Sequence, residues 1–188
     1  MPTPNTVAAD CVPTLAEALG IAAFAPATGG DILTESQGCE VVAFTGSGGK
    51  TTAMFRLAAE LVARGGRVLI TTTTHIYPPD SQQFPATVIP VVMEDSLEAL
   101  VHSARSALDR QSVVVLARGL GADGKLVGID PGWIEQLPKR LHVNHLLVES
   151  VNLPRSGNLS PNTVHLAEPK RRTFIRAASY SEKQGRIA

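Results

Sequence analysis

The sequence predicts an α/β domain in which a mostly parallel sheet lies between two layers of helices. Short runs rich in valine, isoleucine and leucine alternate with longer segments of helical periodicity, and this alternation is typical of βαβ units. The runs are apolar at nearly every position, as in parallel strands that are covered on both faces. At 188 residues with 44% hydrophobic content, the chain is long enough for one domain with a sizeable core.

Local patterns predict the individual elements. Apolar residues at helical spacing from Leu15 to Ala22 predict a short amphipathic helix. The expected strands cover residues 41–45, 67–72, 87–93, 112–117 and 143–149, and the expected longer helices cover residues 51–62, 94–110 and 131–141. Pro138 is expected to limit the last helix. Residues 118–130 contain four glycines and are expected to form a loop with a small hairpin around Asp123-Gly124.

Charge divides the chain into parts. Residues 151–188 contain seven basic and two acidic residues, which leaves ten basic and fifteen acidic residues for residues 1–150. We therefore expect an N-terminal helix and connector over residues 1–37, the α/β domain over residues 38–150, and a basic tail over residues 151–188. The tail lacks sustained periodicity and is expected to be poorly ordered or loosely docked. Its candidates for regular structure are residues 163–166 and 174–178.

Composition excludes several classes of protein. A formal net charge of zero argues against a general nucleic-acid binder. Cys11 and Cys39 lack the spacing of metal ligands, which predicts ordinary reduced thiols. The apolar stretch at residues 21–27 is too short and too interrupted by proline for a signal or a membrane span. We expect no membrane association and a cytoplasmic location.

The most informative segment is Gly46–Thr52, which reads Gly-Ser-Gly-Gly-Lys-Thr-Thr between an expected strand and an expected helix. Glycines allow successive N–H groups to turn around an anion, and the helix start adds its positive dipole end. Lys50 is placed to reach the β- and γ-phosphates, and the Thr51 hydroxyl to ligate Mg²⁺. This P-loop NTPase-like pattern predicts a site for ATP or GTP, so we expect residues 38–150 to be a P-loop nucleotide-binding domain. The predicted nucleotide-binding residues are Gly46, Ser47, Gly48, Gly49, Lys50, Thr51 and Thr52.

The motif is shorter than a full Walker A sequence. Phe44 stands where the full motif has its first glycine, six residues before the lysine. Mur-type ligases also use this shorter form. A Mur-ligase-like, ATP-dependent amide-forming activity is therefore an alternative.

Catalysis at such a loop needs an acid and further polar groups. Glu149 ends an apolar run and is predicted to hold Mg²⁺ together with Thr51; the alternative is a strand-end glutamate in solvent. Thr71–Thr74 and His75 end another strand. They are candidates for substrate binding and proton transfer, and the alternative is a threonine run that merely favours strand. The predicted catalytic residues are Lys50, Glu149 and His75.

Other conspicuous residues are better explained by structure than by chemistry. His142 and His145 are three apart in an expected strand, so their side chains point to opposite faces and cannot share a metal ion. Trp133 is expected to pack in the core. The basic cluster at residues 170–172 is expected to be a solvated part of the tail.

Two motifs together resemble the YqeC-like proteins, proposed accessory factors of selenium-dependent molybdenum hydroxylases. That family combines a Gly-Ala-Gly-Gly-Lys-Thr-Thr loop with a strand that ends Thr-Thr-Thr-Thr-His, as Gly46–Thr52 and Val68–Ile76 do here. The likeness continues through the Gly-Lys-Leu-Val-Gly stretch at residues 124–128 and covers about residues 13–149. Beyond it the family continues Val-Glu-Ala-Asp-Gly, whereas Ser150-Val151-Asn152 follow Glu149 here. The C-terminal part is expected to be divergent or truncated, as a frameshift near codon 150 would produce.

The resemblance implies a nucleotide-dependent accessory protein for the maturation or cofactor loading of a molybdenum hydroxylase. Its expected ligands are ATP or GTP and Mg²⁺, and its expected partner is the hydroxylase or the cofactor of that enzyme. A second alternative to an NTPase is a nucleotide-binding switch or chaperone without catalytic activity.

Overall fold

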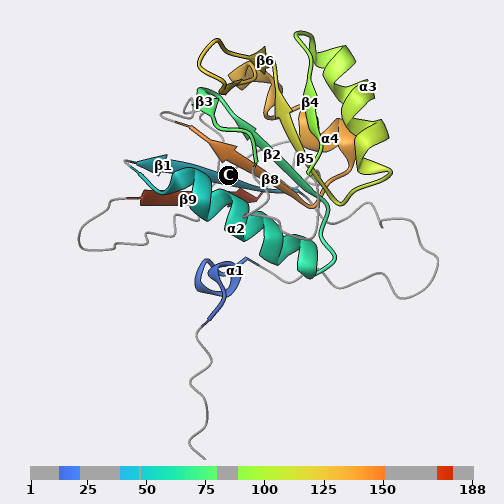
Figure 1. Cartoon of the computed structure of the whole chain (residues 1–188). Helices are drawn as coiled ribbons and strands as arrows, with labels where there is room; N and C mark the ends of the chain where they lie inside the picture. Colours follow the sequence, from blue (N-terminus) through green and yellow to red (C-terminus); the bar gives the residue numbers. More distant parts are fainter. Residues whose placement is uncertain (1–12, 22–38, 47, 80–88, 151–172, 180–188) are drawn as a thin grey trace, which may run out of the picture.

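The computed structural model of the chain describes residues 13–21, 39–46, 48–79, 89–150 and 173–179. A six-stranded sheet lies between helices on its two faces, and a small three-stranded sheet lies beside it (Figure 1). The prediction of a three-layer α/β fold with a mostly parallel sheet is confirmed. No helix in the described part of the chain is both long and apolar enough to cross a membrane.

Five parallel strands form the body of the large sheet, and a sixth pairs with its edge. The strands are β1 (Glu40–Gly46), β2 (Val68–Thr72), β4 (Val91–Met93), β5 (Val113–Ala117), β8 (His145–Glu149) and β9 (Thr173–Ser179). Their order is β4-β5-β2-β8-β1-β9, with β9 antiparallel to β1. Strand β8 lies between β1 and β2, and Glu149 is in register with Phe44 on one side and Thr72 on the other. The ends of three strands therefore meet at Glu149.

Helices cover both faces of this sheet, which explains the continuous apolar runs. Helix α2 (Lys50–Ala63) packs on one face, and α3 (Leu97–Leu108) and α4 (Leu137–Leu141) pack on the other. All five residues of β5 are buried, and their side chains alternate between the two resulting apolar clusters. Trp133, in the 3-10 helix η1 (Pro131–Trp133), packs as predicted against the apolar cluster on the side of α3 and α4.

A small antiparallel sheet consists of β3 (His75–Ile76), β7 (Leu126–Val127) and β6 (Gly119–Leu120), in the order β3-β7-β6. The connection between β6 and β7 is the hairpin expected around Asp123-Gly124, and Gly124 has the left-handed φ of 75° that favours glycine. The strand β3 was not predicted, because two residues are too few to show periodicity.

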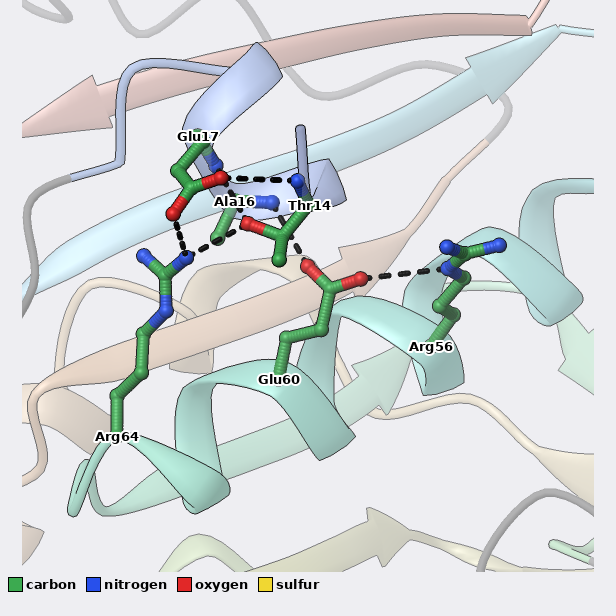
Figure 2. A network of polar contacts seen from close by, with 6 residues as sticks. All are labelled: Thr14, Ala16, Glu17, Arg56, Glu60 and Arg64. Atoms are coloured by element: carbon green, nitrogen blue, oxygen red, sulfur yellow. Dashed lines mark hydrogen bonds and ion pairs between the residues drawn. The ribbon is translucent and has the colours of Figure 1, made fainter. Parts of the chain in front are cut away.

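Helix α1 (Leu15–Ala18) confirms the expected N-terminal helix and is joined to α2 by polar contacts (Figure 2). Glu60 on α2 accepts a hydrogen bond from the N–H of Ala16 at 2.8 Å. Arg64, just after α2, donates to the Thr14 hydroxyl at 2.6 Å. The contact with Glu60 satisfies one of the N–H donors that a helix start leaves unpaired, and the contact with Arg64 adds a second bond between the two helices.

Two predictions need correction or completion. The helix expected over residues 131–141 is instead two short helices, η1 and α4, and Pro138 lies in the first turn of α4, where no intrahelical N–H bond is lost. In the tail, the candidate at residues 174–178 is confirmed as part of β9, which pairs antiparallel with β1 along seven residues. Residues 163–166, the basic cluster at 170–172, and Cys11 lie outside the described residues.

Candidate functional site

The glycine-rich segment joins β1 to α2 at the carboxyl edge of the sheet. Gly48 and Gly49 have left-handed φ values of 82° and 74°, a conformation that side chains with Cβ rarely adopt. Gly49 is the N-cap residue of α2 and provides no side-chain cap, so main-chain N–H groups and the positive dipole end form the start of this helix. Ser47 lies outside the described residues, and Thr52 is exposed in the first turn.

Three predicted site residues meet at this helix start. The Thr51 hydroxyl donates a hydrogen bond to Glu149 Oε2 at 2.5 Å, although the two residues are 98 positions apart. The Lys50 ammonium lies 3.4 Å from the other carboxylate oxygen, Oε1. The structure thus brings together Lys50 and Thr51 from α2 with Glu149 from β8.

Burial makes this contact energetically important. Glu149 is only 6% exposed, and a carboxylate so buried needs compensating charge and hydrogen bonds. Lys50, the Thr51 hydroxyl and the start of α2 supply that compensation. Glu149 is therefore not a strand-end glutamate in solvent.

The group fits a magnesium–nucleotide complex better than a metal held by protein alone. Hydroxyl and carboxylate oxygens are hard ligands of the kind that Mg²⁺ prefers, and Mg²⁺ is commonly bound through one or two carboxylates plus phosphate oxygens. No group of three or more His, Cys, Asp or Glu side chains in the described residues is arranged to hold a metal. Thr51 and Glu149 are the residues here that could hold such an ion, and its other ligands would have to come from outside the described residues.

The threonine segment, Thr71–Thr74, borders this group. Thr71 donates its hydroxyl to the carbonyl of Leu116 at 2.9 Å, and Thr72 donates to the carbonyl of Glu149 at 3.0 Å. Both side chains are fully buried. These two hydroxyls satisfy carbonyls of neighbouring strands, so Thr71 and Thr72 serve the structure of the sheet.

His75 lies at the start of β3, and its side chain is exposed. It is in register with Val127 of the small sheet, whereas the next residue, Ile76, points to the buried side. His75 is separate from the contacts that join Thr51 and Glu149. Its catalytic role stays a prediction.

The two other histidines occupy different environments. His142 is exposed and ends α4 with a left-handed φ of 49°. His145 is buried in β8, with Nδ1 at 3.8 Å from Glu40 Oε2 and without a hydrogen-bond partner in the described part of the chain. Desolvation lowers the pKa of His145 to about 4.

Sequence reasoning missed two residues around the site. Ser150 is fully buried, and its hydroxyl accepts a hydrogen bond from the Thr73 hydroxyl at 3.1 Å. Gly128 packs so closely against the threonine segment that a Cβ there would lie 2.6 Å from main-chain atoms of Thr72, Thr73 and Thr74. A single glycine at the end of a strand pattern is the signal that could have indicated such a close approach.

Comparison with known proteins assigns the chain to a family. A family model described as "YqeC protein" matches residues 42–150, more than half of the chain. The chain belongs to the YqeC family. It is similar to "Uncharacterized protein YqeC" of Escherichia coli (strain K12), with 34% identity over 110 residues. That alignment covers 58% of this chain and 40% of the relative. The chain therefore spans less than half of the length of that relative. No solved structure matches the chain significantly.

The family match confirms the resemblance predicted from the two motifs. It includes Lys50, Thr51, the threonine segment, Gly128 and Glu149. It ends at residue 150, where the sequence was expected to diverge from the family pattern.

Proposed function

We propose that this YqeC-family protein binds a nucleoside triphosphate, ATP or GTP, with Mg²⁺ at the carboxyl edge of its sheet. One observation carries the proposal: the contact of Glu149 with both Lys50 and Thr51, which joins the end of β8 to the glycine-rich start of α2. A lysine, a hydroxyl and a carboxylate around a helix N-terminus are the groups that a magnesium–triphosphate complex requires.

Each group has a distinct role in the proposal. Main-chain N–H groups of the Gly46–Thr52 loop surround the phosphates, and the Lys50 ammonium neutralises their charge. Thr51 and Glu149 hold Mg²⁺. The ion supplies charge stabilisation at the transferring phosphoryl group when it is bound. Phosphoryl transfer depends mainly on such positioning and electrostatic stabilisation, so the same groups support NTP hydrolysis.

The Glu149 carboxylate lies 3.4 Å from the Lys50 ammonium and neutralises its charge. Phosphate oxygens compete for the same ammonium when a nucleotide enters. With Mg²⁺ bound, Glu149 and the phosphates would both be ligands of the ion, so the carboxylate and the phosphates would no longer compete for Lys50. The proposal therefore includes binding that is strongly magnesium-dependent.

Equilibrium binding of fluorescently labelled ATP and GTP tests the proposal. We expect micromolar affinity in Mg²⁺ and about a tenfold loss in Lys50→Ala, because a charge-assisted phosphate contact is removed. Lys139→Ala is the matched control, since Lys139 is an exposed lysine on α4, across the sheet from α2. Equal binding by both variants, or no binding by the folded wild type, contradicts the proposal. Release of inorganic phosphate then separates an NTPase from a non-catalytic nucleotide-binding switch.

The biological role that we propose is assistance in the maturation or cofactor loading of a selenium-dependent molybdenum hydroxylase. This role is supported by the YqeC family match and the motif pair described above. In cells that make such a hydroxylase, Lys50→Ala should lower the molybdenum and selenium content of the purified enzyme, and Lys139→Ala should not. Unchanged molybdenum and selenium content in both variants contradicts this role without affecting the nucleotide proposal.

A further inference from the structure

The loop after β7 closes directly on the threonine segment. Gly128 donates its N–H to the carbonyl of Thr74 at 2.7 Å, and Ile129 donates to the carbonyl of Thr72 at 2.9 Å. A Cβ at position 128 would lie 2.6 Å from three main-chain atoms of the segment. The φ of Gly128 is outside the left-handed region. Glycine is therefore required here by the close approach of two main chains, not by its backbone conformation.

The threonine segment in turn holds the main chain of Glu149. The Glu149 carbonyl accepts two hydrogen bonds, from the Thr72 hydroxyl and from the Thr73 N–H, both at 3.0 Å. The next residue, Ser150, is bonded to the Thr73 hydroxyl at 3.1 Å and donates its N–H to the Phe44 carbonyl at 3.0 Å. An unbroken series of contacts thus runs from Gly128 through the threonine segment to the residue that meets Thr51.

We propose that Gly128 and Thr72 are positioning residues, which set the place of the Glu149 carboxylate beside Thr51. The inference rests on the proposed function, in which Glu149 and Thr51 hold Mg²⁺. Lys50 and Thr51 belong to α2, which does not take part in these contacts. A displaced threonine segment therefore moves Glu149 relative to Thr51 and leaves the phosphate loop in place. The magnesium-dependent part of nucleotide binding should be lost, and the magnesium-independent part should be kept.

A first test needs no nucleotide. Gly128→Ala forces the two main chains apart, and amide hydrogen exchange of Thr73 should become at least about fivefold faster, because its bond to Glu149 weakens. Gly119→Ala is the matched control in the same hairpin, because a Cβ at Gly119 meets nothing within 4 Å. Its exchange at Thr73 should equal that of the wild type.

A second test uses a matched pair of isosteric variants. Thr71 and Thr72 are adjacent, fully buried, and each donates its hydroxyl to a strand carbonyl. Thr72→Val removes the bond to Glu149, and Thr71→Val removes the bond to Leu116. Similar losses of stability are expected for both variants. Only Thr72→Val should reduce the ratio of ATP affinity in Mg²⁺ to that in EDTA, by about fivefold.

A double-mutant cycle shows whether the effect passes through Glu149. In a Glu149→Gln background, Thr72→Val should cause no further loss of magnesium dependence. Additive losses, or equal effects of Thr71→Val and Thr72→Val, overturn the inference. Unchanged Thr73 exchange in folded Gly128→Ala also overturns it; if that variant does not fold, the exchange test is made on Thr72→Val against Thr71→Val. Should the wild type bind no nucleotide, the proposed function fails, and Thr73 exchange alone decides the inference.

Discussion

Substituting His145 should alter how the stability of this protein depends on pH. His145 is 4% exposed, its Nδ1 lacks a hydrogen-bond partner in the described structure, and burial lowers its pKa from about 6.5 to about 4. As pH falls, the unfolded chain therefore binds this proton before the folded protein does. The contribution of neutral His145 is present above about pH 6.5 and is lost progressively down to about pH 4.

The size of the effect follows from the two pKa values. A difference of one unit between the folded and unfolded pKa values corresponds to about 1.4 kcal/mol in the free energy of unfolding, so His145 contributes roughly 3 kcal/mol in total. About 2 kcal/mol of this contribution is lost between pH 7 and pH 5. Glu40 faces His145 and acts in the opposite direction, because burial raises its pKa. Its proton stabilises the folded state on acidification, and that contribution is lost as the pH rises. Glu40 is retained in all variants compared, so the difference between them isolates His145.

Urea unfolding at pH 7 and pH 5 measures this effect. Between these values the wild type should lose about 2 kcal/mol more than His145→Leu, which has no titrating side chain at this position. His102→Gln is the control, since His102 is exposed on α3, and it should lose as much as the wild type. Equal losses in the wild type and in His145→Leu would show that His145 is not held neutral by burial, and would refute the reasoning.

Two further substitutions test other parts of the structure. Thr51→Val should lower ATP affinity about fivefold in Mg²⁺ and leave affinity in EDTA unchanged, because only the hydroxyl that contacts Glu149 is lost. The control Thr52→Val, at an exposed position, should change both affinities by the same factor. Titration with labelled nucleotide measures the affinities of the two variants. Glu60→Ala should reduce the free energy of unfolding in urea by about 1–3 kcal/mol, because the Ala16 N–H loses its acceptor. The exposed control Glu135→Ala should have little effect, and equal losses would mean that Glu60 does not hold α1.

The sequence predicted the elements whose pattern is local and long. Strands β5 and β8 are continuous apolar runs, and α2 has a clear apolar face followed by Gly65, which has a left-handed φ of 82°. The glycine-rich loop and Glu149 were also recognisable, because the loop follows such a run and Glu149 ends one. These parts of the fold and of the site depend on side-chain periodicity and turn chemistry, which are visible in one chain.

Other features depend on contacts between distant segments and could not be predicted. The order that inserts β8 between β1 and β2 brings Glu149 to Thr51, and no local pattern encodes that order. Residues 174–178 were a candidate for regular structure, but the pairing of β9 with β1 could not be predicted, because main-chain hydrogen bonds can form between any residues with a free N–H. Gly128 belongs to the family-like stretch at residues 124–128, but the sequence alone does not show why a glycine is needed there. A Cβ has no space at this position, and that restriction arises only when the two main chains have come together.

The central claim is that α2 and β8 form one magnesium–nucleotide site, and Glu149→Gln tests it most directly. ATP or GTP affinity is measured in Mg²⁺ and in EDTA for the wild type and for this variant. We expect Mg²⁺ to raise wild-type affinity about tenfold or more and to have almost no effect on Glu149→Gln. In EDTA the variant should bind at least as tightly as the wild type, because Lys50 no longer faces a carboxylate at 3.4 Å. An equal effect of Mg²⁺ on both proteins would contradict the claim, because Glu149 would then have no part in the metal site.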